Sequence, residues 1–121
     1  MIGRWRTVVF DTRDPRGLAE FYAELLGGTV TEEEPDWVVV VDPDGRRLAC
    51  QLSPEHVAPR FPDSAASQQV HLDVLVDDPD DAERRVLAIG ATRVTEPHHE
   101  DRFRVFLDPA GHPFCLVFDV D

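Results

Sequence analysis

Hydrophobic residues mark one helix clearly near the start of the chain. The apolar positions recur at the spacing of one helix face: Leu18, Phe21, Tyr22, Leu25 and Leu26. Asp14 can cap this helix, and Pro15 suits its first position because the N–H that proline lacks would be unpaired there. Gly27 and Gly28 follow the apolar stripe, as is typical of a helix end. The pattern therefore predicts an amphipathic helix that begins after Asp14 and ends before Gly27.

The same pattern occurs a second time. The stretch "TVVFDTRDPRGLAEFYAELLGGT" aligns with "HLDVLVDDPDDAERRVLAIGAT", so that Asp14-Pro15 matches Asp78-Pro79. Further along, "VVVVDPDGRRLACQL" aligns with "RVFLDPAGHPFCLVF". Each copy predicts a strand, a helix and further strands, with a hairpin turn at Asp-Pro-x-Gly, where Pro fixes φ and Gly tolerates positive φ. A fixed repeat of this kind indicates one architecture built twice.

The sequence thus predicts an α+β fold of two tandem βαβββ modules in a single domain over residues 1–121, curled around a cleft. Module one covers about residues 4–53 and module two about residues 69–121. The segment between them, about 54–68, is rich in proline and small polar residues and is interpreted as a connection or a lid. The acidic run Glu32–Glu34 is interpreted as a solvated turn.

Alternation along the strands assigns the side chains to faces, because successive strand residues point to opposite sides. The residues predicted to face the helices are Val8, Phe10, Thr12, Leu48, Cys50, Leu52, Leu72, Val74, Val76, Phe114, Leu116 and Phe118. The opposite face carries the candidate ligand-binding residues Thr7, Arg47, Ala49, Gln51, His71, Asp73 and Cys115. Trp37 and Phe103 occupy matching repeat positions and could stack on a flat ligand or serve packing alone. We expect this second face to be the ligand-binding surface.

Composition narrows the classes of partner. The chain has 121 residues, 42% hydrophobic and 30% charged, which is typical of a globular domain. No apolar run approaches the roughly 18 residues of a membrane span, and no signal peptide is recognisable, so we expect a cytoplasmic protein without a membrane partner. The net charge of -12 argues against nucleic acid. A small molecule is the expected partner.

The basic residues and cysteines limit the chemistry. All 12 basic residues are arginine, so mechanisms that need a lysine are excluded. Cys50 and Cys115 show no CxxC spacing, which favours a reduced protein and leaves a bridge between them open. Cys115 could act as a nucleophile if His71 lowered its pKa, but a small buried hydrophobe is the preferred interpretation.

The repeat, with "FYAELLGG" in its first half and "LDPAGHPFCLV" in its second, resembles the vicinal oxygen chelate superfamily. That superfamily groups glyoxalase I, bleomycin-resistance proteins and extradiol dioxygenases, and this chain is most similar to its short glyoxalase-like members. The resemblance covers nearly the whole chain. Motifs of this kind are more specific for fold than for function.

The resemblance implies four metal-ligand positions, two in each module, which fall on Thr7, Ala49, His71 and Cys115. Members that bind a metal use His, Gln and Glu, so only His71 is a usual ligand, and Gln51 could enter after a register shift. His71 is therefore either a ligand or base whose tautomer Asp73 holds, or a polar residue lining the pocket.

Other histidines are interpreted without a metal. His98 and His99, followed by Glu100 and Asp101, resemble a metal cluster but lie in a predicted loop. His112 fits the chemistry of a turn, and His56 belongs to the linker.

Two functions follow from the resemblance. The preferred hypothesis is a ligand-sequestering protein of the bleomycin-resistance type without a complete metal site. The alternative is a metal-dependent lyase, isomerase or dioxygenase with His71 as a ligand to Zn, Ni, Fe or Mn. The sequence leaves open whether the chain is an enzyme. Relatives of this size often form homodimers, so we expect a homodimer.

Overall fold

The computed structural model describes residues 1–60, 63–68, 70–94 and 102–119. The chain divides into two units, Met1–His56 and Val57–Asp121. The first unit contains the predicted module one, and the second contains most of the predicted linker together with module two. Below, module one and module two denote these two units, and each is described by itself.

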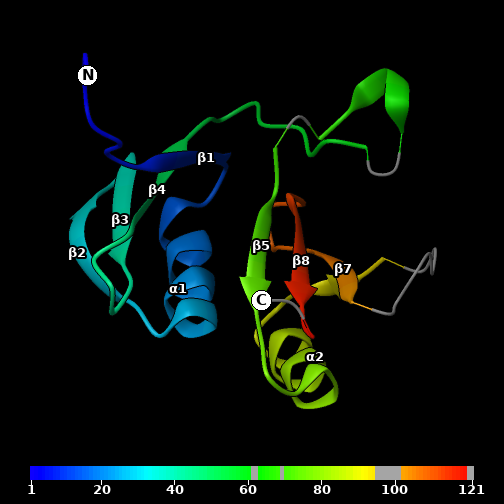
Figure 1. Cartoon of the computed structure of the whole chain (residues 1–121). Coiled ribbons are helices and arrows are strands. Elements are labelled where there is room, and N and C mark those ends of the chain that lie inside the picture. The colour runs from blue at the N-terminus through cyan, green and yellow to red at the C-terminus, as the bar shows by residue number, and fades with distance from the viewer. Residues whose placement is uncertain (61–62, 69, 95–101, 120–121) are drawn as a thin grey trace. The chain divides into compact units, whose positions relative to one another are not determined.

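Module one is a four-stranded sheet with one helix. Its elements are β1 (Val8–Thr12), α1 (Pro15–Leu26), β2 (Thr29–Glu34), β3 (Trp37–Val41) and β4 (Arg47–Leu52). The strand order is β1-β4-β3-β2. Strands β1 and β4 are parallel, and the other pairs are antiparallel. Helix α1 lies against β3 and β4 (Figure 1).

Module two repeats this topology. Its elements are the short 3₁₀ helix η1 (Ser64–Ala66), β5 (Leu72–Leu75), α2 (Pro79–Ala88), β6 (Thr92–Arg93), β7 (Phe103–Leu107) and β8 (Pro113–Val117). The strand order β5-β8-β7-β6 matches that of module one, again with a parallel first pair (Figure 1). The predicted α+β fold of two βαβββ modules is confirmed.

The predicted aspartate caps at the helix starts are confirmed in both modules, and the predicted end of the first helix before Gly27 is confirmed as well. The side chain of Asp14 accepts a hydrogen bond from the backbone N–H of Gly17 at 3.0 Å, and that of Asp78 accepts one from Asp81 at 3.1 Å. Gly27 ends α1 with a φ of 67°, a left-handed conformation that favours glycine. A Cβ atom on Gly28 would lie only 2.8 Å from Val40, so the chain leaves the helix in close contact with β3.

The core of module one is apolar on both sides of the contact between helix and sheet. Leu18, Phe21 and Tyr22 of α1 are buried. The rings of Phe10 and Tyr22 meet edge to face, with 5.3 Å between their centroids. Phe10 pairs in register with Cys50, which pairs with Val38, so this buried row crosses three strands on the helix side.

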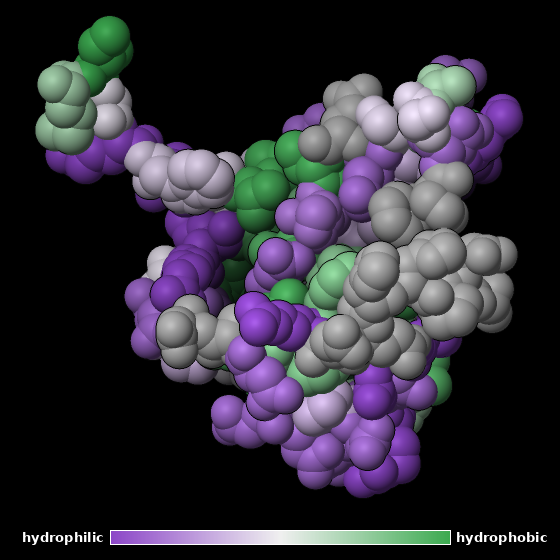
Figure 2. Space-filling view, turned by 45° about the vertical axis from the view of Figure 1, so that its right-hand side comes forward, coloured by the Kyte–Doolittle hydropathy of each residue, from purple (hydrophilic) through white to green (hydrophobic). Residues whose placement is uncertain are grey.

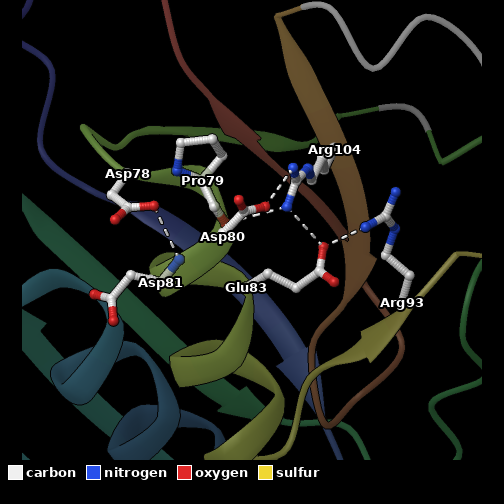
Figure 3. Close-up of polar contacts among 7 residues, drawn as sticks. All are labelled: Asp78, Pro79, Asp80, Asp81, Glu83, Arg93 and Arg104. Atoms are coloured by element: carbon white, nitrogen blue, oxygen red, sulfur yellow. Dashed lines mark hydrogen bonds and ion pairs between the residues drawn. The ribbon is translucent and has the colours of Figure 1, made fainter.

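In module two, ion pairs as well as apolar packing connect helix α2 to the sheet (Figure 3). Val86 is the buried residue of α2. Arg104 of β7 occupies the repeat position of Val38 and contacts Glu83 at 3.2 Å and Asp80 at 2.9 Å. Glu83 also pairs with Arg93 of β6. The guanidinium groups of Arg93 and Arg104 lie over the rings of Phe106 and Phe118, at 5.5 and 5.7 Å from their centroids.

Two predictions about local structure are wrong. Leu52, predicted to be buried, is 37% exposed, because it lies at the last position of β4. Glu32–Glu34, predicted to be a turn, belong to the edge strand β2, which pairs with β3. Glu32 pairs with Arg47, and Glu33 with Arg16, so ion pairs accompany the strand pairing. Charged side chains on an edge strand also discourage further strand pairing.

The surface seen in Figure 2 is mainly hydrophilic. Figure 2 shows mostly hydrophilic residues among the described ones on this face, with smaller hydrophobic areas between them. Among the described residues, the structure contains no helix long and apolar enough to cross a bilayer.

Candidate functional site

The candidate residues of module two come together on one face of its sheet. Asp73 of β5 pairs in register with Cys115 of β8, and Cys115 pairs with Val105 of β7. Register partners point to the same side of a sheet, and so do residues two apart in a strand. His71, just before β5, therefore shares this face with Asp73 and Cys115, as predicted.

Three possible ligand atoms meet at one end of this face. The Nε2 atom of His71 lies 3.0 Å from Oδ1 of Asp73. Ligand atoms of His71, Asp73 and Cys115 all lie within 4.8 Å of one another. The side chains of His71 and Asp73 are 37% and 58% exposed, whereas Cys115 is buried. We call these three residues the His-Asp-Cys group.

The environment of Cys115 keeps its thiol protonated. The pKa of Cys115 is raised from 9.0 to about 11, mostly by burial and in addition by the charge of Asp73 and a hydrogen bond to it. The neutral thiol can donate a hydrogen bond to the Asp73 carboxylate. Because the thiolate is the reactive form, Cys115 is a poor nucleophile at neutral pH in the metal-free protein.

The rest of this face in module two is mostly apolar. The neighbouring register row contains Leu75, Val117 and Phe103. Leu75 is 62% exposed. Phe103 was a sequence candidate, and the register places it one row away from Cys115. Module two thus presents an apolar area beside a polar group.

The equivalent face of module one lacks such a polar group. Val9, Ala49 and Val39 form the row that corresponds to Asp73, Cys115 and Val105. Ala49 is fully buried. The hydroxyl of Thr7, which corresponds to His71, donates to the carbonyl of Val8 at 3.3 Å. These residues offer no counterpart to the His-Asp-Cys group.

The other candidates of module one lie on the same face. Gln51 pairs in register with both Asp11 and Trp37, so an aromatic and two polar side chains share one row. Gln51 is exposed and Trp37 is half-buried. Arg47 reaches Glu32 of β2 at 3.1 Å. This ion pair engages Arg47 within its own sheet.

The four-ligand metal set implied by the resemblance does not fit this chain. Thr7 and Ala49 cannot supply the two ligands expected of module one, and Cys115 stands where a glutamate is expected. Asp73 is instead the additional donor beside His71. The sequence predicted that Asp73 lies on this face, as a ligand-binding residue and as the partner that holds the tautomer of His71, but did not indicate it as a metal ligand.

Among the described residues, no other histidine belongs to the His-Asp-Cys group. His98, His99, Glu100 and Asp101 lie outside the residues that the structure describes. The backbone N–H of His112 donates to Asp108 at 3.0 Å within the turn before β8, in line with the predicted turn role. His56 lies in the segment after β4, where its carbonyl accepts a hydrogen bond from Arg13.

A known protein family matches the chain over most of its length. A family model described as a glyoxalase-like domain matches residues 7–117. No curated protein sequence matches the chain.

Solved structures with similar folds have low sequence identity to the chain. One is a glyoxalase/bleomycin resistance protein/dioxygenase family enzyme from Burkholderia phytofirmans, with TM-score 0.71, 20% identity, and coverage of 94% of this chain and 97% of that one. Another is a possible glyoxalase from Bacillus cereus, with TM-score 0.71, 17% identity, and coverage of 97% and 99%. A third is the fosfomycin resistance protein FosX from Mesorhizobium loti, with TM-score 0.68, 18% identity, and coverage of 97% and 92%. Because the sequence identities are this low, the structural similarity shows a shared fold and nothing about function.

Proposed function

The chain belongs to the glyoxalase-like domain family of the vicinal oxygen chelate superfamily, and on that basis we propose that it binds and sequesters a small molecule. The ligand would lie on the face of the module two sheet that carries His71, Asp73 and Cys115. It would do so without the four-ligand metal centre of the superfamily's enzymes.

The difference between the two modules carries this proposal. In module two the face combines the His-Asp-Cys group with the apolar row of Leu75, Val117 and Phe103. In module one the matching polar positions hold Thr7, Val9 and Ala49. A surface with much apolar area and a few polar groups is typical of small-molecule binding. Half of the superfamily's ligand positions are thus replaced by residues that cannot hold an ion in the usual way.

The face also suggests the chemistry of the ligand. Phe103 and Leu75 favour an apolar or aromatic body, which could stack or pack against them. Asp73 accepts hydrogen bonds, so a hydroxyl or ammonium group near it would be favoured. Trp37 and Gln51 offer a second aromatic and polar pair in module one. The fosfomycin resistance protein among the structural neighbours makes a small organic antibiotic a reasonable first class to test.

A thermal-shift screen tests the proposal. Metal-free protein is heated with a panel of aromatic and aliphatic molecules that carry a hydroxyl or amine. A ligand at 100 times its dissociation constant stabilises the folded state by about 2.7 kcal/mol, which raises the melting temperature by several degrees. Phe103→Ala and Asp73→Asn should each weaken the hit at least about tenfold, the loss expected of one good contact.

Leu87→Ala is the matched control for that screen. Leu87 is an exposed apolar residue of α2, outside the candidate face, so its removal should leave ligand binding unchanged. If the hits bind equally well to Phe103→Ala and Asp73→Asn, the candidate face is not the binding surface. Consumption of the bound ligand would identify an enzyme instead.

A metal-dependent enzyme is the second candidate, favoured by the approach of three ligand-type side chains in module two. A bound ion could act as a Lewis acid on neighbouring oxygens of a substrate. His71→Ala would then abolish turnover. A protein that binds its ligand unchanged after chelator treatment and shows no turnover with added metal would contradict this second function.

A further inference from the structure

We propose that the N-terminal arm, residues 1–6, pairs as an added strand with the outer edge of β2 in a second copy of this chain, and that two copies exchange their arms in this way. The resemblance implies a homodimer but not the surfaces that form it. This interface lies in module one and does not depend on the small-molecule proposal, so each can fail while the other holds.

The arm is exposed, partly apolar and basic. Met1, Ile2 and Trp5 are 101%, 110% and 87% exposed, and Arg4 and Arg6 lie on either side of Trp5. The arm runs away from the sheet of module one (Figure 1). Two of the 12 arginines lie in it, whereas all 24 acidic residues of the chain follow it. Large exposed apolar side chains grouped together mark an interaction surface, and the arginines select an acidic partner.

The outer edge of β2 has the matching chemistry. This strand is the last in its sheet, so only one of its sides is paired within the module. Glu32 and Glu34 point to the same side of the sheet, and Trp37 of β3 is the register partner of Glu34. Arg4 and Arg6 have the same spacing, so an added strand would bring both arginines opposite the two glutamates. Opposite charges on neighbouring strands stabilise their pairing, and a guanidinium can also lie over the Trp37 ring.

The acidic edge selects a basic strand over other strands. Its carboxylates repel a strand of the same charge, so two copies do not pair β2 against β2. The arm offers arginines instead. Glu32 already pairs with Arg47, but its side chain is still 49% exposed and can accept a second arginine. Glu34 is exposed as well. Attraction of the arm and repulsion of acidic strands together make the edge specific.

The arm cannot reach this edge within its own module. In the order β1-β4-β3-β2, a strand added outside β2 lies four strand spacings from β1, or about 19 Å. The chain from Arg4 to Val8, where β1 begins, spans at most about 14 Å even when fully extended. From Arg6 to Val8 it spans about 7 Å. The strand that receives the arm must therefore belong to another copy.

Reciprocal exchange closes the assembly. Two copies related by a two-fold axis each donate one arm and receive one, so both β2 edges are paired and no arm is left to recruit a third copy. Because β1 follows the arm directly, its exposed residue Val9 lies beside the same interface.

A charge exchange tests this pairing in the full-length chain without an N-terminal tag. One variant carries Arg4→Glu and Arg6→Glu, and the other carries Glu32→Arg and Glu34→Arg. Each variant alone brings like charges together at both arm contacts, so its dimer should weaken at least about tenfold, because every cross-strand charge pair is reversed. Mixed in equal amounts, the two variants restore opposite charges at both contacts and should form a heterodimer. Native mass spectrometry identifies it.

A double substitution on α2 is the matched control. Arg84→Glu with Arg85→Glu changes the net charge as much as the arm variant does, at side chains that are 71% and 78% exposed. This variant should dimerise as the unaltered chain does. Circular dichroism shows whether each variant is folded before its mass is compared.

The fluorescence of Trp5 reports on the arm while the arm and the acidic edge are unaltered. Trp5 and Trp37 are the two tryptophans of the chain, so Trp37→Phe leaves Trp5 as the reporter. Its emission should move to shorter wavelength as the protein concentration rises and the dimer forms. The same variant with Arg4→Glu and Arg6→Glu should show this shift only at concentrations at least about tenfold higher.

Three results would overturn the exchange. The first is a dimer of the arm variant as tight as that of the unaltered chain. The second is a mixture of the two folded variants without a heterodimer. The third is a Trp5 emission that does not change with protein concentration, as expected if the arm packs on its own module or serves a partner of another class, such as an anionic membrane. None of these results concerns the His-Asp-Cys group, so they leave the small-molecule proposal standing.

Discussion

Cys115 shows how one residue's surroundings determine its reactivity. With a pKa of about 11, its thiol is almost entirely protonated at pH 7.5. In chelator-treated Cys50→Ala protein, where Cys115 is the remaining cysteine, alkylation by iodoacetamide should be at least about 100 times slower than in the unfolded chain, because two pKa units remove that much thiolate. The rate is measured by mass spectrometry of the modified protein.

Asp73→Asn provides the comparison for this experiment. Removing the carboxylate charge lowers the pKa of Cys115, but burial, the largest cause of the shift, remains. Alkylation should therefore accelerate only a few-fold. If folded Cys50→Ala protein is alkylated as fast as the unfolded chain, the thiol of Cys115 is neither kept protonated nor protected by burial.

The same thiol predicts how stability changes at alkaline pH. The pKa of Cys115 is raised in the folded state, so its stabilising contribution is fully present below pH 9 and is lost as the pH rises from 9 to about 11. We expect a loss of about 1 kcal/mol over this range, less than the shift alone would give because solvent reaches the neighbouring side chains. Urea unfolding of metal-free protein at several pH values measures it. In Cys115→Ala this part of the pH dependence should disappear; an unchanged slope would contradict the assignment.

At the scale of elements, Glu83 connects helix α2 to the sheet of module two. It pairs with both Arg104 and Arg93, whose side chains are only 17% and 26% exposed (Figure 3). Glu83→Ala should lower the free energy of unfolding by about 2–3 kcal/mol, because it leaves charged groups with little access to water. Urea denaturation followed by circular dichroism measures the change.

Glu20→Ala is the matched control on helix α1. Glu20 pairs with Arg16 across one helical turn, and both side chains are more than half exposed. Exposed pairs contribute about 0.5 kcal/mol or less. If both substitutions cost the same, the contacts of Glu83 do not hold α2 in place.

The elements also show what the sequence can and cannot predict. The stripe of Leu18, Phe21 and Tyr22 and the caps at Asp14 and Asp78 are local signals, and the structure follows them. The strand character of Glu32–Glu34 is not local, because it depends on pairing with β3 and on arginines elsewhere in the chain. The packing of α2 through Arg104 was missed for the same reason: a charged residue at a core position is understood only with its partners.

The sequence predicted which residues of module two belong to the candidate site, but not how closely their side chains approach one another. Strand alternation and the repeat are properties of the sequence, and they put His71, Asp73 and Cys115 on one face. The parallel register of Asp73 with Cys115 and the 3.0 Å approach of His71 to Asp73 are properties of the folded sheet. They turn three separate candidates into one chemical group.

At the scale of the whole molecule, we predict a homodimer. Each sheet has two edge strands, β1 and β2 in module one and β5 and β6 in module two. An edge strand exposes unpaired backbone N–H and C=O groups, which can pair with a strand of another chain. Charged residues on β2 discourage such pairing, whereas β1 carries the exposed apolar residue Val9. Exposed apolar residues elsewhere include Trp5 and Val57, at 87% and 79%. Homodimers with two-fold symmetry are the commonest assembly of soluble homo-oligomeric proteins.

Light scattering coupled to size-exclusion chromatography tests this at several concentrations. The monomer mass is 13.6 kDa, so a dimer doubles it. Val9→Glu places a charge on an exposed edge residue and should shift the mass toward the monomer, since burying an unpaired carboxylate at an interface is unfavourable. Leu87→Glu, at a similarly exposed position on α2, is the comparison. A monomeric mass at every concentration would contradict the dimer. A dimer that Leu87→Glu breaks and Val9→Glu spares would place the interface on the helix, because the charge then disrupts contacts at α2 rather than at β1.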